Sequence, residues 1–410
     1  MNAYALLIAL ALAAEYGLCL LADLLNLRSL RTEVPEAFRD VYDAERYRRS
    51  QEYTRAKTRF GIVPETVGLA VLCAFWAAGG FAWLDRAVRG LGWGRVATGL
   101  AFIGALALAK SLLDLPFGWY RTFVLEERFG FNKTTARTFW ADFAKGWLLA
   151  LVLGAPLLAA ILWFFERAGW AAWLWCWLAT SLFALFVQFV APTWILPLFN
   201  KFRPLESGEL REAVLDYARR VAFPLEGLFV VDGSRRTTKA NAFFTGFGRR
   251  KRIGLYDTLI EKHATDELVA IVAHEIGHYK RGHVLKSLVL GIAQAGAVFF
   301  LLSLALRHAG LFAAFGVSEP STHAGLVFFG LLYAPLDLVL SFFLHAYSRR
   351  NEFEADAYAR ETTGRPESLA RALARLSADA LDNLTPHPLY VKLHYSHPPT
   401  VERVAALRSE

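Results

Sequence analysis

Long apolar stretches alternate with polar segments along this 410-residue chain. Seven of the stretches are about 20 residues long, which is the length that a helix needs to cross the hydrocarbon core of a bilayer. They cover residues 3–25, 63–84, 96–115, 147–165, 171–191, 284–306 and 324–346. The pattern predicts an α-helical multi-pass membrane protein with about seven transmembrane helices. The second and third stretches could instead pack as a re-entrant pair, and the sixth could run on directly from the segment before it.

The polar segments divide the rest of the chain. We expect residues 1–191 to hold transmembrane helices one to five with their cytoplasmic loops, and residues 284–346 to hold helices six and seven. Residues 192–283 would form most of a soluble cap, which residues 347–410 would complete. Low-complexity tracts and internal repeats are absent from the sequence. The chain is therefore expected to form one integrated membrane domain with a cap.

The segment before the sixth span predicts a small sheet. Residues 206–222 have helical periodicity, and the apolar run 228–231 ends at Asp232-Gly233, which is typical of a strand and turn. Residues 240–247 and 252–256, joined by 248–251, are typical of a β-hairpin. The edge of such a hairpin can hold a peptide in extended form by adding it as a strand. The pattern alone is equally compatible with a hairpin that only supports the following helix.

Composition and charge agree with a membrane protein. The chain is 55% hydrophobic, and its net charge of +8 is concentrated in two loops. The loops after spans one and three carry Arg28, Arg31, Arg39, Arg46, Arg48, Arg49, Arg55, Lys57, Arg59, Arg121, Arg128, Lys133, Arg137 and Lys145. The loops on the other side hold Arg86, Arg89, Arg95, Arg167 and Arg307. Because basic loops stay in the cytoplasm, we expect the N-terminus outside and the cap and C-terminus inside.

Three further observations limit the possible classes of protein. No Lys or Arg precedes the first apolar stretch, which is also longer than the core of a signal peptide, so we interpret it as a retained span. Cys19, Cys73 and Cys176 lie inside predicted spans and lack metal-binding spacing, so neither a disulfide framework nor a thiolate site is expected. The basic loops suit anionic lipid headgroups, and no nucleic-acid-binding motif competes with that interpretation.

The sequence HEIGH at residues 274–278 carries the clearest chemical signal. Residues four apart share a helix face, so His274 and His278 can bind one metal ion, while Glu275 lies beside them as a general base. The flanking residues are small or apolar and include no proline. The motif therefore predicts a zinc hydrolase. The simpler alternative is a helix that has two histidines on its surface.

A catalytic zinc takes a third protein ligand, which must come from elsewhere in the chain. The downstream candidates are His283, His345, Glu352, Glu354, Asp356, His394 and His397. On a continuous helix His283 lies about 500° past His278 and faces away from the pair. Glu352 and Asp356 are one turn apart on one face, whereas Glu354 is rotated by about 200° from Glu352. We therefore assign Glu352 to the metal and Asp356 to a hydrogen bond with a ligating histidine.

These segments resemble the Ste24-type CAAX prenyl protease 1 family, which comprises integral-membrane zinc metallopeptidases of the M48 type. The resemblance rests on HEIGH, on SRRNEFEADAYA at 348–359 and on HYSHPPTVER at 394–403. LEERFGFNKT at 125–134 and NAFFTGF at 241–247 are also similar to segments of that family. The resemblance implies Glu352 as third zinc ligand, and seven helices that enclose a chamber capped by a gluzincin-like zinc protease domain. It also implies that the protein lies in a lipid bilayer, binds one zinc ion per chain and acts on a peptide or protein substrate, prenylated or not.

The same resemblance assigns further site residues. His397 and Arg403 match residues beside the scissile carbonyl, where fixed donors would stabilise the oxyanion of the transition state. Asn241, Ala242, Phe243 and Phe244 match the substrate-binding strand edge. Glu15, Lys110, Asp114, Gln188, Gln294 and Asp337 lie within predicted spans and should face protein or a polar interior.

The expected function is hydrolysis of peptide bonds near the C-terminus of CaaX-type proteins by a monomeric protease. An HtpX-like quality-control protease is the alternative, because the single methionine and the Ala-, Leu- and Arg-rich composition hint at a bacterial genome. We accordingly expect the bacterial inner membrane, or the endoplasmic reticulum if the chain is eukaryotic. A third possibility is a seven-span transporter or receptor whose metal site is vestigial.

Overall fold

A computed structural model describes residues 2–246 and 251–409 and contains seven helices that are long and apolar enough to cross a membrane. Three of them, Ala3–Arg28 (α1), Ala44–Ala77 (α2) and Arg95–Glu126 (α4 with a π-helical end), precede residue 130. The fourth and fifth are Ala136–Arg167 (α5 and α6) and Gly169–Phe199 (α7 and α8). The last two are His283–Ala305 (α12) and Thr322–Thr363 (α14). The expectation of seven spans is confirmed.

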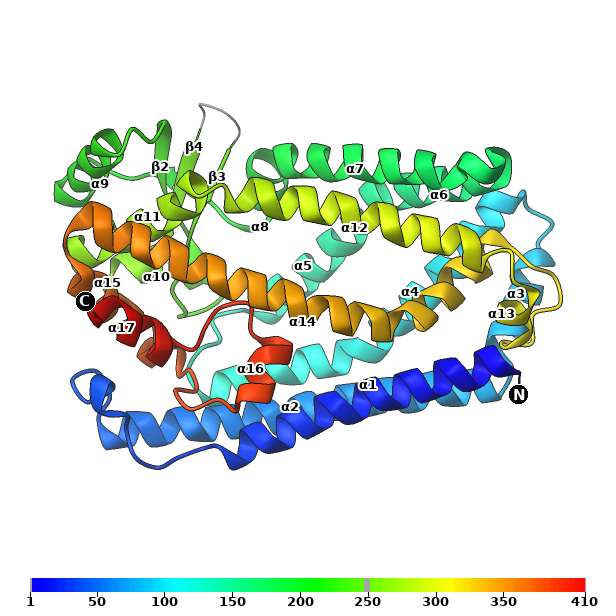
Figure 1. Cartoon of the computed structure of the whole chain (residues 1–410), viewed down its shortest axis with the longest axis horizontal. Helices are drawn as coiled ribbons and strands as arrows, with labels where there is room; N and C mark the ends of the chain where they lie inside the picture. The colour runs from blue at the N-terminus through cyan, green and yellow to red at the C-terminus, as the bar shows by residue number, and fades with distance from the viewer. Residues whose placement is uncertain (1, 247–250, 410) are drawn as a thin grey trace.

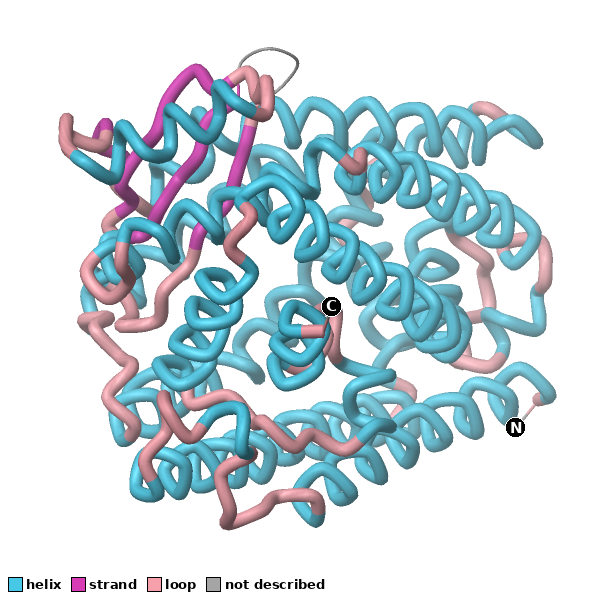
Figure 2. The backbone as a smooth tube through the Cα atoms, turned by 60° about the vertical axis from the view of Figure 1, so that its left-hand side comes forward, coloured by secondary structure: helices cyan, strands magenta, loops and turns pink. Residues whose placement is uncertain are grey.

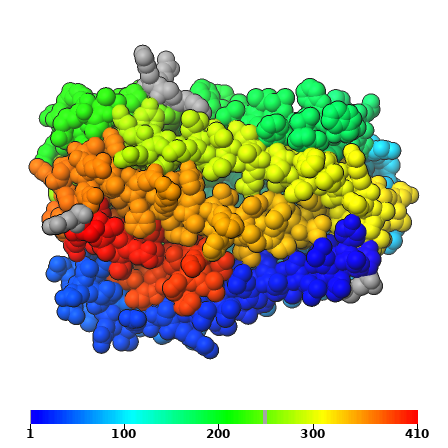
Figure 3. Space-filling view, in the orientation of Figure 1, coloured from blue at the N-terminus to red at the C-terminus, as the bar shows by residue number. Residues whose placement is uncertain are grey.

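The long helices run roughly along the longest axis of the molecule, and the soluble elements gather at its two ends (Figure 1). One end holds the sheet together with α9 (Glu209–Arg220), α11 (Thr265–Lys280), α15 (Pro366–Ala380) and α17 (Thr400–Arg408). The other end holds α3 (Gly80–Arg89), α13 (Ala309–Ala313) and the N-terminus. In the space-filling view, the C-terminal helices in orange and red cover the same end as the green sheet region (Figure 3). The cap is thus assembled from segments far apart in the sequence.

Two glycines end helices that were expected to continue. The second span was expected over residues 63–84, but α2 ends at Ala77, and Gly79 turns the chain into α3 with a φ of 72°. The sixth span does not run on from the motif helix, because Gly282 has a φ of 69° and separates α11 from α12. Positive φ costs glycine little and other residues more. Hydrophobicity alone does not report these turns.

The seventh span and the polar segment after it form one helix. The 42 residues of α14 include both the apolar span and the acidic residues around 352–356. Because the helix is continuous, it extends from the membrane-spanning part into the cap, where the acidic residues lie (Figure 1).

The cap contains a four-stranded sheet whose strand order is β1-β2-β4-β3. Strands β1 (Phe202–Pro204) and β2 (Leu225–Val231) are antiparallel, and β2 is parallel to β4 (Lys251–Tyr256). Strand β3 (Ala242–Thr245) pairs antiparallel with β4, as the hairpin pattern predicted, although most of the expected turn at 248–251 lies outside the described residues. Figure 2 shows the strands side by side at one corner of the molecule. At the edge of the sheet, no other described strand pairs with β3.

One hydrophobic core joins the sheet to the motif helix. Leu228, Ile253 and Leu255 of the sheet and Leu268, Val272 and Ile276 of α11 are all at most 5% exposed. The α11 residues recur every four positions and so form one helix face. Short helices α10 (Asp257–Ile260) and α16 (Pro388–His394) complete the cap.

The polar residues expected inside the spans are partly paired with one another. Lys110 Nζ lies 2.6 Å from Asp114 Oδ1, and Gln294 Nε2 lies 3.5 Å from Asp337 Oδ1. The three cysteines are free thiols, as predicted. Large apolar side chains on these helices are exposed, among them Trp170 and Leu285 at 74% and 65%. Such exposure suits contact with lipid.

Candidate metal centre

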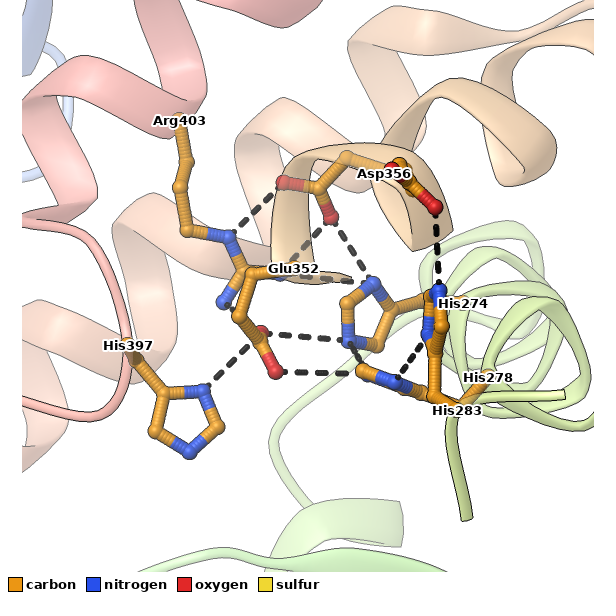
Figure 4. A network of polar contacts seen from close by, with 8 residues as sticks. His274, His278, His283, Glu352, Asp356, His397 and Arg403 are labelled. Carbon is orange, nitrogen blue, oxygen red and sulfur yellow. Dashed lines mark hydrogen bonds and ion pairs between the residues drawn. The ribbon is translucent and has the colours of Figure 1, made fainter. Parts of the chain in front are cut away.

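Helix α11 presents its two histidines on the side opposite to its core face. His274 follows Val272 by two residues, which is about 200° around the helix. Because the Val272 face packs on the sheet, His274 and His278 point toward α14 (Figure 4). The rings stand nearly perpendicular, with centroids 4.7 Å apart. The helix thus brings both imidazoles to one position, as the HExxH spacing predicted.

Close packing of α11 against α14 places Glu352 beside the histidines. Gly277 permits this approach, since a Cβ there would lie 3.0 Å from the carbonyl oxygen of Ala355. Glu352 is 3% exposed, and its Oε1 lies 3.3 Å from His278 Nε2. Its Oε2 lies 3.5 Å from His274 Nε2. Of the described residues, only His274, His278 and Glu352 offer a cluster of three donor atoms, all within 4.8 Å of one another.

This donor set fits a divalent metal ion. The Nε2 atoms of His274 and His278 are 3.1 Å apart, so in neutral rings two lone pairs converge. The buried Oε2 of Glu352 accepts no well-directed hydrogen bond, although three side-chain nitrogens lie within 3.5 Å of it. A cation bound by these atoms would pair with the two imidazole lone pairs and with Glu352 Oε2. Two imidazoles and one carboxylate are the ligands of a catalytic zinc that keeps a position open.

Asp356 and Arg403 form a buried pair behind the cluster. Asp356 Oδ1 lies 2.8 Å from His274 Nδ1, which is the contact expected from the spacing of Glu352 and Asp356. Arg403 donates to the same carboxylate from Nε and Nη2 at 2.8 and 2.7 Å. Its Nη1 lies 3.2 Å from Glu352 Oε2. The guanidinium therefore contacts both carboxylates of α14.

Burial and these contacts shift several pKa values. Burial lowers the pKa of His274, but the nearby carboxylates of Asp356 and Glu352 outweigh it and raise that pKa to about 9. Burial raises the pKa of Glu275, against the opposing effect of His274 and His278. Burial also lowers the pKa of Arg403, yet the bonds to Asp356 reverse the shift and raise it. The site is thus dry enough for charges to act strongly on one another.

His397 reaches the cluster from the loop between α16 and α17. Its side chain is 65% exposed, and its Nδ1 lies 2.9 Å from Glu352 Oε2. Figure 4 shows the ring on the side of Glu352 away from the two metal-site histidines. Among these side chains in contact with Glu352, that of His397 is the most exposed.

Strand β3 lies next to the motif helix. Phe244 packs against Tyr279 of α11, with ring centroids 6.3 Å apart. Asn241 immediately precedes the strand, and its carbonyl accepts a hydrogen bond from the amide of Tyr256 at 3.0 Å. The residues expected to bind substrate, Asn241 to Phe244, therefore border the sheet edge beside α11.

The expectation that His283 faces away from the pair is wrong. It assumed a continuous helix, but the turn at Gly282 brings His283 Nδ1 to 3.0 Å from His278 Nδ1. Glu354, which we also set aside, lies 3.2 Å from His283 Nε2. The glycine after the motif was the available sequence signal, because it favours a helix end. The other two candidates, His345 and His394, lie outside the three-residue cluster.

Comparison with known families matches almost the whole chain. A profile described as CAAX prenyl protease N-terminal, five membrane helices, matches residues 23–201. The profile of peptidase family M48 matches residues 204–410. The boundary between the two falls just after α8, close to where the cap begins.

Relatives from distant organisms agree with these profiles. The chain is 36% identical to CAAX prenyl protease 1 of Saccharomyces cerevisiae, with 92% of this chain and 88% of the relative covered. It is 37% identical to the Arabidopsis thaliana homologue and 32% identical to the Homo sapiens homologue, with coverage of 95% and 93%, and of 92% and 89%.

A solved structure matches the fold over its full length. The crystal structure of S. mikatae Ste24p superposes with a TM-score of 0.94 at 32% identity, and both chains are covered completely. A peptidase family that matches both the membrane part and the cap excludes the seven-span transporter or receptor that composition alone left open.

Proposed function

The chain belongs to the CAAX prenyl protease 1 family of M48 zinc metallopeptidases, and on this premise we propose which residues perform the hydrolysis and on which substrates. The protein is a multi-pass membrane metalloprotease. We propose that it hydrolyses peptide bonds near the C-terminus of CaaX-type proteins, with one zinc ion held by His274, His278 and Glu352.

The observation that carries this proposal is the convergence of three donor atoms within 4.8 Å, next to the half-buried Glu275. When bound, zinc would supply a Lewis acid that polarises the substrate carbonyl and acidifies the attacking water. The protein side chains then account for proton movement and for orientation.

Glu275 is the proposed general base. It takes a proton from the water as the water oxygen attacks the carbonyl carbon, and it gives the proton to the amine as the C–N bond breaks. The products are a carboxylate and a free amine. Burial raises the pKa of Glu275, which makes the carboxylate a better base and its acid form easier to keep for the second step.

Arg403 and His397 are the proposed donors to the oxyanion. Two nitrogens of Arg403 are committed to Asp356, so Nη1, beside Glu352, is the nitrogen left to meet a substrate oxygen. His397 is exposed enough to turn from Glu352 toward the substrate. Fixed donors of this kind lower the energy of the transition state more than that of the substrate.

The edge of β3 is the proposed docking position for the substrate. A peptide added alongside residues 241–245 would extend the sheet through main-chain hydrogen bonds. Such bonds make few demands on sequence. The same edge would therefore serve both CaaX proteins and the broader substrates of an HtpX-like protease.

The proposed orientation keeps the cap in the cytoplasm, because the basic residues concentrate in the loops after spans one and three. The proposed compartment is the bacterial inner membrane, or the endoplasmic reticulum in a eukaryote, and the proposed state is a monomer. Chemical labelling of a cysteine introduced at position 260 tests the orientation: reagent added from the periplasmic or lumenal side should not reach it.

Cleavage of a CaaX peptide, farnesylated or unmodified, tests the substrate. Purified zinc-loaded protein should remove the last three residues, as detected by mass spectrometry. A requirement for the farnesyl group would indicate a dedicated prenyl-protein protease. Equal cleavage of both peptides would favour a general membrane-associated endopeptidase. Cleavage of neither would contradict the proposed substrate class.

A further inference from the structure

The two metal-site histidines have different partners at Nδ1. His274 Nδ1 faces a carboxylate directly, at 2.8 Å from Asp356 Oδ1. His278 Nδ1 instead faces another imidazole, at 3.0 Å from His283 Nδ1. The other nitrogen of His283, Nε2, lies 3.2 Å from Glu354 Oε2. His278 thus reaches a carboxylate through His283.

This chain of contacts has one proton arrangement that suits metal binding. Nε2 of His278 points at the donor cluster, 3.3 Å from Glu352 Oε1, and needs its lone pair for the metal. The ring proton of neutral His278 then lies on Nδ1 and is donated to His283 Nδ1. His283 in turn carries its proton on Nε2 and donates it to Glu354. Each ring holds one proton, and each hydrogen bond has one donor and one acceptor.

The surroundings fix this arrangement in place. His283 is only 3% exposed, and its ring meets that of His278 at 71° with centroids 5.1 Å apart. Glu354 is oriented from its other oxygen by Arg350 Nε, which donates at 3.0 Å. The turn at Gly282 supplies the direction change that brings the two histidines together. Figure 4 shows His278 and His283 adjacent at the edge of the cluster.

We propose that His283 and Glu354 are positioning residues that hold His278 in the tautomer and orientation in which Nε2 binds the metal. This proposal rests on the zinc site of the proposed function. Neither residue touches the metal or the substrate. Partners of this kind are typically worth about tenfold to a hundredfold in metal affinity.

The test is the zinc dissociation constant of the full-length protein, measured by competition with a chelator. His283→Ala should bind zinc about tenfold to a hundredfold more weakly than the wild type. His283→Asn should stay within about threefold of the wild type, because its Oδ1 replaces Nδ1 as the acceptor for His278. In the cobalt-substituted protein, the visible spectrum should change in the alanine variant and be restored in the asparagine variant.

His263 supplies a matched control. It is also a buried histidine in contact with a glutamate, its Nδ1 lying 3.1 Å from Glu267 Oε2, but it contacts no residue of the metal cluster. His263→Ala should lower the thermal midpoint and leave zinc affinity and the cobalt spectrum unchanged. Equal losses of zinc affinity in the His263 and His283 variants would mean a general structural effect and overturn the proposal.

Glu354 allows the test even if the His283 variants do not fold. Glu354→Ala removes the carboxylate that accepts from His283 and should weaken zinc binding, whereas Glu361→Ala, at an exposed position on the same helix, should not. Wild-type zinc affinity in Glu354→Ala or in His283→Ala would overturn the positioning role of these two residues and leave the zinc site itself untouched. Failure of the wild type to bind zinc would instead contradict the metal site itself.

Discussion

Asp356 Oδ1 lies 2.8 Å from Nδ1 of His274, one helical turn beyond the carboxylate of Glu352. The same group accepts two hydrogen bonds from Arg403. One buried carboxylate therefore orients a metal-site histidine and is itself oriented by a guanidinium. The geometry of the donor cluster depends on this pair as much as on the donors.

Replacing Asp356 by Asn should weaken zinc binding about tenfold to a hundredfold, because His274 loses its charged partner. Chelator competition on the purified protein measures the change. Glu361→Gln is the control, since Glu361 lies on the same helix and pairs with Arg281 at the surface. Equal affinities of Asp356→Asn and wild type would show that Asp356 does not orient His274.

Replacing Arg403 by Lys should destabilise the cap by roughly 1.5–3 kcal/mol, because an ammonium cannot reproduce both hydrogen bonds to the buried Asp356. Arg408 makes a similar two-nitrogen contact with Glu367, but at the surface. Arg408→Lys should therefore change stability by less than about 0.5 kcal/mol. Denaturant unfolding in detergent compares the two variants, and similar losses would contradict the account.

Asp382 should make stability depend on pH. Desolvation by the protein around it raises its pKa to about 6, although the side chain keeps contact with solvent and nearby Lys57 and Lys239 lower the pKa. The folded protein therefore binds this proton more tightly than the unfolded chain does, and stability falls as pH rises from about 4 to 6. Asp382→Asn should melt about 2 °C above wild type at pH 7.5, a small gain because the side chain is exposed to solvent.

The sign of this effect is the test. The advantage of Asp382→Asn should disappear near pH 4, where the wild-type carboxyl is protonated in both states. Melting curves of both proteins at the two pH values give the comparison. An advantage that instead appeared only at low pH would refute the assigned direction of the shift.

Gly282→Ala should destabilise the protein by roughly 1–2 kcal/mol, because the position has a positive φ. A steric clash would not contribute, since open space surrounds the site of the added Cβ. Gly291→Ala is the matched control within α12, where the added Cβ also meets open space but the backbone is helical. That variant should be stabilised by about 0.5–1 kcal/mol. The thermal midpoint should therefore fall in Gly282→Ala and rise in Gly291→Ala. Equal shifts in the two variants would mean that alanine causes no backbone strain at position 282.

Much of this architecture is predictable from sequence. Seven spans follow from hydrophobic length, and helical spacing puts Glu352 and Asp356 on one helix face, the face that meets His274 in the structure. Both depend on periodicities that a sequence displays directly. The strand pairing of 242–245 with 251–256 follows in the same way from alternation and turn residues.

The misjudged features depend on single backbone turns. Gly79 ends the second span before its apolar pattern ends, and Gly282 reverses the expected direction of His283. Glycine is compatible with both helix and turn, so its conformation is decided by packing. Because the helix ends at Gly282, His283 also contacts Glu354, a pairing that the assumption of a continuous helix did not predict.

The most direct test of the central claim compares wild type with Glu275→Gln for zinc content and for cleavage of a CaaX peptide. We predict one zinc per chain in both proteins and a loss of turnover of at least about a hundredfold in the variant, because the general base is gone while the three ligands remain. Full activity in Glu275→Gln, or a wild-type protein that cleaves without zinc, would contradict the account.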